Sequence, residues 1–417
     1  MTLIAGCLPS VPDCTRIFYV TASKLAEFRI FVALQPTADD MTPDFLSPFT
    51  FEFCLLTLFA LSALIQLLYF WIIFSRLAFY KRKPLPSQRR PVSVVVCARN
   101  EYRNLKKNLP TLLDQIYDDF EVVVVNDSSG DDTDYLLKSF ADQYPRLKVV
   151  HFRQHLNFFS GKKFPLSIGI KSATHEHLLL TDADCRPNSP YWIREMQSCF
   201  REGTDLVLGY GRYEAGKGML NRLIRFDTVY VAMQYLSYAM AGLPYMGVGR
   251  NIAYKKSLFY KAGGFVSHYR IPSGDDDLFV NQVAKKSNTR VSFIPESHTV
   301  STAKNTLTGW FYQKRRHFGT GRYYKKKHKF LLSFYYLSLL LFYALFIVLI
   351  FSQYNIYLLL SIFLIRMFSA LFLFKKCMLR LEERNLLVYL PVFELFFLFF
   401  NPLVSLSAYI FKEQRWK

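Results

Sequence analysis

The sequence predicts an α/β domain with a mostly parallel sheet, flanked on both sides by helices that cross a membrane. Between residues 91 and 325, short apolar runs rich in β-branched residues alternate with helical patterns. Continuous apolar strands are typical of a parallel sheet covered by helices on both faces. Long apolar runs with at most one charged residue each occupy 49–75, 331–351, 353–374 and 386–411. About 20 helical residues suffice to cross the hydrocarbon.

The composition excludes a disordered chain, and the charge pattern indicates a membrane orientation. Of the 417 residues, 51% are hydrophobic and 17% aromatic, which is too apolar for a disordered protein. Lys and Arg total 52 against 32 Asp and Glu, and the acid-free segments 76–90 and 312–329 hold six and eight of them. Such segments beside apolar runs are typical of cytoplasmic loops. We expect an integral protein of the cell (inner) membrane, with a cytoplasmic α/β domain and no nucleic-acid partner.

The segments around the first span carry separate predictions. Residues 1–48 contain no apolar run long enough to cross a membrane, and Met41 lies shortly before the first such run, 49–75. We therefore interpret 1–40 as a gene-model extension that is not translated. Residues 76–90 are predicted to form a basic cytoplasmic linker between the first span and the α/β domain.

The last two apolar runs contain one ionisable side chain each. Arg366 and Glu394 both lie 8 residues from the predicted cytoplasmic end of their run, which is about 12 Å along a helix. Charges inside a membrane pair with one another or line a polar path, so we predict that these two side chains face each other. Pro391 and Pro402 lie in the run 386–411, which is therefore predicted to be either transmembrane or re-entrant.

Four strands are predicted in the α/β domain, over 91–98, 121–129, 147–152 and 177–184, with helical patterns between them. Ligands of such sheets bind at the carboxyl ends of the strands. Three of these ends carry polar segments: ARNE (98–101), NDSSGDD (126–132) and DADC (182–185). We therefore expect a polar ligand site along this edge.

The DAD segment contains two carboxylates, Asp182 and Asp184, which cannot both be buried and ionised without a cation. Mg²⁺ prefers one or two carboxylates together with phosphate oxygens. A solvated turn is the ordinary alternative. A phosphatase with Asp182 as nucleophile is disfavoured, because Arg186 stands where such sites carry Thr or Val.

Two further residues fit a nucleotide ligand. Asp127 follows a buried strand and could accept a hydrogen bond from a base or a ribose hydroxyl. Lys162 lies at a helix start, where backbone amides and an ammonium group together favour a diphosphate. The alternatives are helix capping for the acidic segment and solvent exposure for the lysine.

Eight segments occur in the order found in membrane-bound family-2 glycosyltransferases, and the chain resembles that family over roughly 91–320. The segments are CARNE (97–101), VVVVNDSS (122–129), GKKFPLSIGI (161–170), TDADC (181–185), GVGRNIAYKKSLF (247–259), GGF (263–265), SGDDDLF (273–279) and QKRRH (313–317). Bacterial poly-N-acetylglucosamine, hyaluronan and cellulose synthases belong to this family. The resemblance implies a GT-A (Rossmann-like) domain over 91–325 and a role in polysaccharide biosynthesis.

The implied reaction is the inverting transfer of a hexose or N-acetylhexosamine from a UDP-sugar to a lipid-linked or growing saccharide acceptor. A bound Mg²⁺ or Mn²⁺ is the implied cofactor. The resemblance also implies roles for individual residues: Glu101 and Asp127 for the nucleoside, Lys162 for the phosphates, Asp182 for the donor sugar or ribose, Asp184 for the metal, and Arg250 and Asn251 for the acceptor side.

The SGDDDLF segment matches the family's catalytic segment in two registers. Alignment on Leu278 makes Asp275 the catalytic base, whereas alignment on Gly274 makes it Asp276, which we favour. Inversion in one displacement needs a carboxylate that accepts the hydroxyl proton. Adjacent carboxylates raise one another's pKa towards a useful value. A charged first turn of a helix is the alternative interpretation.

The QKRRH segment departs from the family's QxxRW pattern. Gln313 and Arg316 match it, but His317 replaces the tryptophan. Arg316 is expected to neutralise the departing diphosphate. Loss of an aromatic platform for a sugar ring makes long-chain synthesis doubtful.

Three rival interpretations remain. Within the enzyme class, a single addition to a polyprenyl-phosphate or a glycolipid fits the same residues. A membrane transporter would explain the spans but not the carboxylates. An inactive nucleotide-binding regulator would bind UDP without turnover.

Overall fold

The computed structural model describes residues 51–81, 89–152 and 161–411. These residues all belong to one compact unit, Phe51–Lys417. The interpretation of 1–40 as untranslated, with Met41 as the start, concerns residues outside the described ranges, and so do residues 82–88 of the predicted linker 76–90.

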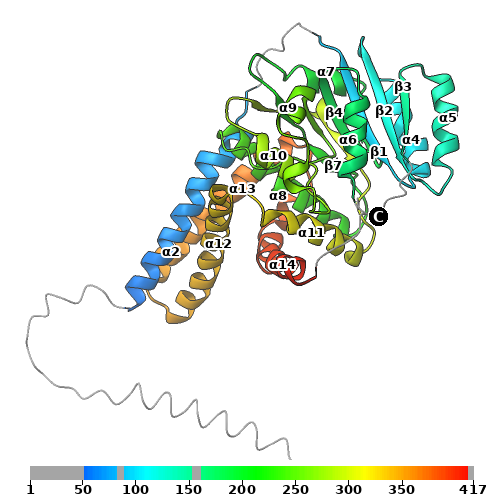
Figure 1. Cartoon of the computed structure of the whole chain (residues 1–417). Coiled ribbons are helices and arrows are strands. Elements are labelled where there is room, and N and C mark those ends of the chain that lie inside the picture. Colours follow the sequence, from blue (N-terminus) through cyan, green and yellow to red (C-terminus); the bar gives the residue numbers. More distant parts are fainter. Residues whose placement is uncertain (1–50, 82–88, 153–160, 412–417) are drawn as a thin grey trace, which may run out of the picture. The chain divides into compact units, whose positions relative to one another are not determined.

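The α/β domain is built on a seven-stranded sheet with the order β3-β2-β1-β4-β8-β6-β9 (Figure 1). Four parallel strands form one half: β1 (Val92–Ala98), β2 (Phe120–Asp127), β3 (Leu147–Phe152) and β4 (His177–Asp182). The other half holds β6 (Leu206–Leu208), β8 (Ile252–Lys255) and β9 (Thr289–Val291), with β8 antiparallel to both of its neighbours. The predicted α/β fold with a mostly parallel sheet is confirmed.

Helices cover both faces of this sheet because successive residues of each strand point to opposite sides. On one face, Val94 and Val96 pack in a cluster with side chains of α4 (Tyr102–Leu113), α5 (Thr133–Gln143) and α7 (Trp192–Gln197). On the other face, Val95 and Cys97 pack with α6 (Lys163–Ser172) and α8 (Met219–Met240). The fully apolar strands follow from burial on both sides.

A smaller sheet and four helices complete the domain. The strands β5 (Cys185–Pro187), β10 (Thr299–Ser301) and β7 (Gly211–Tyr213) pair in that order. The helices are α9 (Lys256–Lys261), α10 (Asp277–Val283), α11 (Leu307–Gly321) and the already described α8. The small sheet extends the polar edge beyond β4, because β5 begins three residues after Asp182.

In the described part of the chain, four helices are long and apolar enough to cross a membrane: Phe51–Ala78, Lys326–Ser352, Ile356–Arg380 and Leu387–Ile410. The first is α2 (Phe51–Leu68), which continues through a π-helical turn, Tyr69–Phe74, into α3 (Ser75–Ala78). The others are α12 (Lys326–Ser352), α13 (Ile356–Arg380) and α14 (Leu390–Ile410), the last preceded by a 3₁₀ turn at Leu387–Tyr389. Helix α13 extends beyond the predicted end at 374 and includes the basic residues that follow.

Helix α14 packs against α11 of the α/β domain. The Trp310 ring on α11 stacks on Phe400 of α14, with centroids 5.0 Å apart and an interplanar angle of 5°. Pro402 lies inside α14, and the helix continues through it. The helix that carries Gln313 and Arg316 is therefore supported by the last apolar helix.

Candidate active site

The predicted polar segments meet at the carboxyl edge of the sheet, with Lys162 between them. The Lys162 ammonium hydrogen-bonds the Asp182 carboxylate at the end of β4 and lies 3.3 Å from Asp275 Oδ2. The Lys162 side chain is only 11% exposed. Residues from three separate segments are thereby joined: the start of α6, the end of β4 and the loop before α10.

Local backbone geometry holds the start of α6 against that loop. Gly161 has φ +123°, and a Cβ at this position would lie 2.9 Å from the carbonyl oxygen of Pro272. Only glycine tolerates such a conformation and such an approach readily. The next lysine, Lys163, donates to the carbonyls of His268 and Ile271 at 2.7 and 2.9 Å. Its burial lowers the pKa of Lys163 to about 8.

The charges around Asp182 keep this carboxylate ionised. Burial works to raise the pKa of Asp182, but the Lys162 ammonium outweighs it, with help from Arg250 and Arg316, so the pKa is lowered. The Asp182 and Asp275 carboxylates in turn raise the pKa of Lys162, although burial of the ammonium group acts in the opposite direction. The positive charges of Arg250 and Arg316 therefore add to that of Lys162 in stabilising the Asp182 carboxylate.

The three adjacent aspartates have three different environments. Asp275 lies beside Lys162. Asp277 accepts hydrogen bonds from the Tyr324 hydroxyl at 2.8 Å and from the Thr320 hydroxyl. Asp276 accepts from the Gly249 amide at 2.6 Å and from the Asp277 amide at 2.8 Å, as the N-cap of α10. Within the described ranges, no cation forms a salt bridge with Asp276.

This environment raises the pKa of Asp276 to about 7. Burial is the largest cause, followed by the negative charges of Asp275 and Asp277, while the two amide hydrogen bonds act in the opposite direction. A carboxylate of this kind exchanges a proton near neutral pH, which is what a general base requires.

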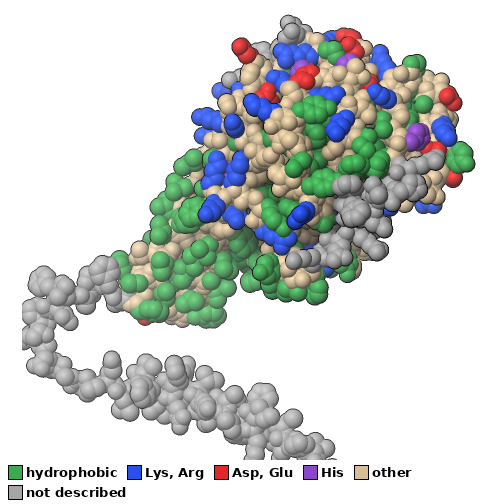
Figure 2. All heavy atoms as spheres, in the orientation of Figure 1, with side chains coloured by type: hydrophobic (Ala, Val, Ile, Leu, Met, Phe, Trp, Pro, Cys, Tyr) green, Lys and Arg blue, Asp and Glu red, His purple; other side chains and the backbone are tan. Residues whose placement is uncertain are grey.

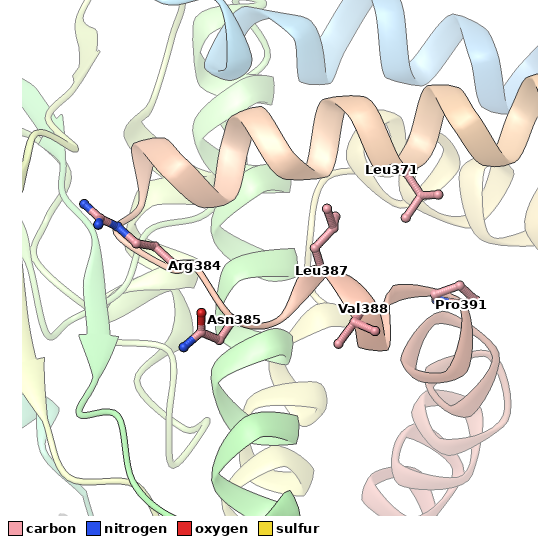
Figure 3. Close-up of a pocket in the computed structure, with 6 residues that line it drawn as sticks. All are labelled: Leu371, Arg384, Asn385, Leu387, Val388 and Pro391. Atoms are coloured by element: carbon pink, nitrogen blue, oxygen red, sulfur yellow. The ribbon is translucent and has the colours of Figure 1, made fainter.

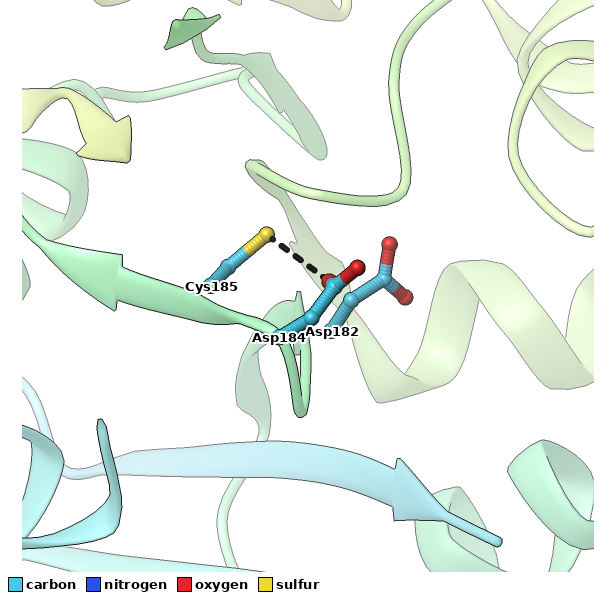
Figure 4. A group of neighbouring side chains, drawn as sticks. All are labelled: Asp182, Asp184 and Cys185. Carbon is cyan, nitrogen blue, oxygen red and sulfur yellow. Dashed lines mark hydrogen bonds between the residues drawn. The ribbon is translucent and has the colours of Figure 1, made fainter. Parts of the chain in front are cut away.

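A second carboxylate cluster fits a hard cation. Oxygen atoms of Asp182 and Asp184 and the sulfur of Cys185 lie within 4.8 Å of one another (Figure 4). The Cys185 thiol donates to Asp184 Oδ1 at 3.4 Å. Burial, followed by the charges of Asp184 and Asp182, raises the pKa of this thiol. The two carboxylates fit Mg²⁺ or Mn²⁺, which take oxygen ligands.

Glu101 and Asp127 lie at the ends of β1 and β2, at the same edge of the sheet. Glu101 is buried, precedes α4, and accepts from the Asn104 amide at 2.5 Å. Asp127 has a side chain only 3% exposed, with Arg99 at 3.9 Å. Burial raises the pKa of Asp127, and Arg99 offsets this in part. Asp127 Oδ1 has no donor among the described residues.

Asn251 does not fit the expectation of a substrate contact. Its side chain is fully buried and accepts from the Trp192 indole at 3.1 Å. Its amide group donates to the carbonyls of Tyr210 and Ser297 at 2.9 and 2.7 Å. Both amide hydrogens are thus used inside the protein. We correct this prediction: Asn251 holds the chain beneath the site, and the neighbouring Arg250 faces it.

Helix α11 contributes Gln313 and Arg316. Gln313 donates to the Tyr213 hydroxyl at 3.1 Å, and its Oε1 is buried without a donor among the described residues. The Tyr213 ring also supports the Arg250 guanidinium, 4.4 Å from its centroid. His317 is exposed on the same helix. The two matching residues of the QKRRH segment therefore lie on the side of Asp182 and Arg250.

Sequence reasoning missed two supports of the aspartate triplet. The Gly249 amide binds Asp276, and a Cβ at Gly249 would lie 3.2 Å from Asp276 Oδ2. The sequence does contain a sign of this support, because Gly249 directly precedes Arg250 in the GVGRN segment. The Thr320 and Tyr324 hydroxyls that hold Asp277 lie just after the QKRRH segment, where the sequence shows only a basic run.

An open cavity of about 700 Å³ lies beside the apolar helices and is lined by Leu371, Arg384, Asn385, Leu387, Val388 and Pro391 (Figure 3). Its walls come from α13, the 3₁₀ turn and the start of α14 (Figure 3). None of the carboxylates lines it, so this space is separate from the carboxylate site.

Comparisons with known proteins agree with this architecture. The family model "Glycosyl transferase family 2" matches residues 93–268. A probable glycosyltransferase of Bacillus subtilis, YdaM, is 25% identical over 238 residues, 54% of each chain. A poly-β-1,6-N-acetyl-D-glucosamine synthase of Staphylococcus epidermidis is 27% identical over 138 residues, covering 30% of this chain and 32% of the relative. The chain thus spans about half or less of the length of these curated relatives.

Among the solved structures that share the fold is the mannosyltransferase PcManGT of Pyrobaculum calidifontis in complex with GDP-Man and Mn²⁺. The match has a TM-score of 0.54 and 20% identity, and it covers 82% of this chain and 98% of that chain. This likeness concerns the fold alone.

Proposed function

We propose that this chain, whose residues 93–268 form a family-2 glycosyltransferase domain with a GT-A fold, is an inverting sugar transferase. It would move a hexose or N-acetylhexosamine from a UDP-sugar to a lipid-linked or growing saccharide acceptor at the inner face of the membrane. The observation that carries the proposal is the Lys162 ammonium between Asp182 and Asp275, because it unites the predicted donor and acceptor segments in one site.

Several groups support a nucleotide-diphosphate donor. Lys162, Arg250 and Arg316 place three cationic groups around Asp182, and such groups bind phosphate oxygens through charge-assisted hydrogen bonds. Asp127 Oδ1 is a buried acceptor without a donor among the described residues, which a base N–H or a ribose hydroxyl would satisfy. Glu101, three residues after the end of the neighbouring strand β1, is the second proposed nucleoside contact.

The metal proposal rests on the two carboxylates of the DAD segment. Asp184 would hold Mg²⁺ or Mn²⁺ with help from Asp182. One carboxylate oxygen of each residue lies within 4.8 Å of the other. When bound, such an ion neutralises charge on the leaving diphosphate. Arg316 would act on the same developing charge from α11, with Gln313 positioning that helix segment through Tyr213.

The acceptor hydroxyl would lose its proton to Asp276. Asp275 is paired with Lys162 and Asp277 is held by two hydroxyls, so each of these carboxylates already has a stabilising partner. Among the described residues, Asp276 has only amide donors, and its pKa is about 7. This difference supports the register that aligns on Gly274.

The membrane part of the proposal rests on four helices long and apolar enough to cross a bilayer and on the basic segments beside them. His317, exposed on α11, presents an imidazole ring in place of the larger indole face of the family's tryptophan. This observation favours the second candidate, a single addition to a polyprenyl-phosphate or glycolipid, over long-chain synthesis.

The test is transfer from individual radiolabelled UDP-sugars by membranes that contain the full chain, with and without EDTA. We expect incorporation from one UDP-sugar into a lipid-extractable or polymeric product, and loss of incorporation with EDTA or in Asp276→Asn membranes. Product size separates a single addition from repeated addition. Uptake of intact sugar without nucleotide release would support the transporter, and UDP binding without turnover would support the inactive regulator.

A further inference from the structure

A second cavity, of about 610 Å³, lies where the first apolar helix meets the α/β domain and is strongly basic. Its lining includes four cationic side chains: Arg76, Arg201, Lys286 and Arg290. The single acid among the lining residues, Glu195, is buried and bonded to Arg194 at 3.1 Å. The cavity therefore carries an excess of positive charge, and none of the carboxylate-site residues lines it.

The cations converge from segments far apart in the chain. Arg76, at the end of the first apolar helix, donates to the carbonyl of Met240 at 3.5 Å. The Lys286 side chain crosses the neighbouring turn, since a Cβ on Gly242 would lie 2.8 Å from Lys286 Cδ. Within the described ranges, Arg76, Lys286 and Arg290 form no salt bridge with a carboxylate. Their charges are available to an anionic ligand.

The rest of the lining combines apolar and aromatic residues with the hydroxyl side chains of Ser198, Thr289 and Ser292. Tyr80 packs edge-on against Phe293, with ring centroids 4.9 Å apart, and both residues line the cavity. Trp71 and Phe79, on the same helix end, are 48% and 47% exposed. Aromatic side chains of this kind mark the level of the membrane–water interface. Figure 2 shows Lys and Arg side chains gathered where the apolar helices meet the remainder of the molecule.

We propose that this cavity binds the phosphate-bearing headgroup of an anionic membrane lipid. Guanidinium and ammonium groups recognise phosphate oxygens, the apolar wall accepts the glycerol and upper acyl region, and the position at the end of a membrane helix favours a lipid over a dissolved ion. Basic residues close to a membrane surface are attracted to anionic headgroups. The site would fasten the α/β domain to the bilayer at a point separate from the sugar-transfer site.

The test uses the full chain in neutral detergent, titrated with dioleoyl-phosphatidylglycerol or, in parallel, dioleoyl-phosphatidylcholine, with bound lipid counted by native mass spectrometry. We expect selective retention of phosphatidylglycerol. Lys286→Gln/Arg290→Gln should weaken it about 30-fold, because each such charge near the surface contributes roughly fivefold. The matched control Lys171→Gln/Lys261→Gln removes the same charge from exposed lysines outside the cavity and should bind like the unchanged protein.

A second measurement does not depend on variants. Cys199 lines the cavity, whereas Cys54 is exposed on α2. Phosphatidylglycerol should slow alkylation of Cys199 by N-ethylmaleimide at least severalfold without slowing that of Cys54, and phosphatidylcholine should do neither. The proposal would be overturned if the protein retained both lipids equally. It would also be overturned if Lys286→Gln/Arg290→Gln retained as much phosphatidylglycerol as the unchanged protein. Protection of Cys199 by inorganic phosphate alone would assign the cavity to a dissolved anion instead.

Discussion

Arg366 and Glu394 form a two-bond ion pair between the apolar helices α13 and α14. The guanidinium donates to Oε2 at 2.6 Å and to Oε1 at 2.7 Å, and the side chains are 0% and 1% exposed. Gln66 of α2 accepts from the same guanidinium at 3.0 Å, and Tyr343 of α12 donates to Glu394 at 2.7 Å. The prediction that Arg366 and Glu394 face each other is confirmed, and the pair joins all four apolar helices.

Breaking this pair on one side should destabilise the protein strongly. Arg366→Met leaves a buried carboxylate without its partner, which typically costs about 3–5 kcal/mol. Arg366→Met/Glu394→Leu should recover most of the loss, because it leaves no buried charge. Thermal unfolding in detergent measures both variants. Arg89→Gln, in the exposed pair with Asp118, is the control and should cost about 1 kcal/mol or less. Equal unfolding temperatures for the single and double variants would contradict the prediction.

Asp276→Asn should reduce the rate of sugar transfer by about 10²- to 10⁴-fold, the usual contribution of a general base, with UDP binding nearly unchanged. Asp277→Asn should act chiefly on stability, because Asp277 is bonded to Tyr324 and Thr320. Turnover, UDP binding and unfolding temperature separate the two effects. Full turnover in Asp276→Asn, with loss in Asp275→Asn, would transfer the role of base to Asp275.

The pH dependence of transfer should show an acidic limb near pH 7. Asp276 accepts a proton only when ionised, and its pKa is raised from 3.8 to about 7. At saturating metal, kcat/KM should therefore fall about tenfold per pH unit below that value and level off above it. A flat profile down to pH 5 would show that no group with this pKa limits the reaction.

Lys162→Met should weaken UDP binding by about 10- to 100-fold, which corresponds to one lost hydrogen bond to a charged group. It should also raise the pKa of Asp182, because the ammonium that lowers it is removed. Lys171→Met, at an exposed position near the end of the same helix, is the matched control. Isothermal titration with UDP compares them, and equal affinities would exclude Lys162 from the donor site.

Metal dependence should distinguish the three clustered residues of Figure 4. EDTA should abolish transfer, and Mn²⁺ or Mg²⁺ should restore it. Asp184→Asn should require a much higher metal concentration, since the carboxylate is the proposed ligand. Cys185→Ser should keep the unchanged metal requirement, because Mg²⁺ and Mn²⁺ prefer oxygen ligands, which the carboxylates supply. Titration of activity against metal concentration checks the EDTA effect and both variants. A shifted metal requirement in Cys185→Ser would indicate sulfur ligation.

Local patterns in the chain predicted the strands and the polar edge. The runs 91–98 and 147–152 lie at β1 and β3 with nearly the same bounds. Strand β1 is buried along its whole length, as a strand covered on both faces should be, whereas the edge strand β3 is partly exposed. The same reasoning located Asp127 and Asp182 at strand ends, and the cost of an isolated charge in lipid predicted the Arg366–Glu394 pair.

Long-range packing decided what those patterns left open. Its place in a family motif predicted that Asn251 contacts the acceptor, yet its side chain is buried and hydrogen-bonded to Trp192, Tyr210 and Ser297. The three adjacent aspartates are chemically identical in the chain and differ only through their partners. Their partners come from positions up to 113 residues away, as for Lys162 and Asp275. The basic cavity likewise exists only where Arg76 and Lys286 are brought together. Local periodicity reports burial of a segment, whereas a side chain's partner depends on how distant segments pack.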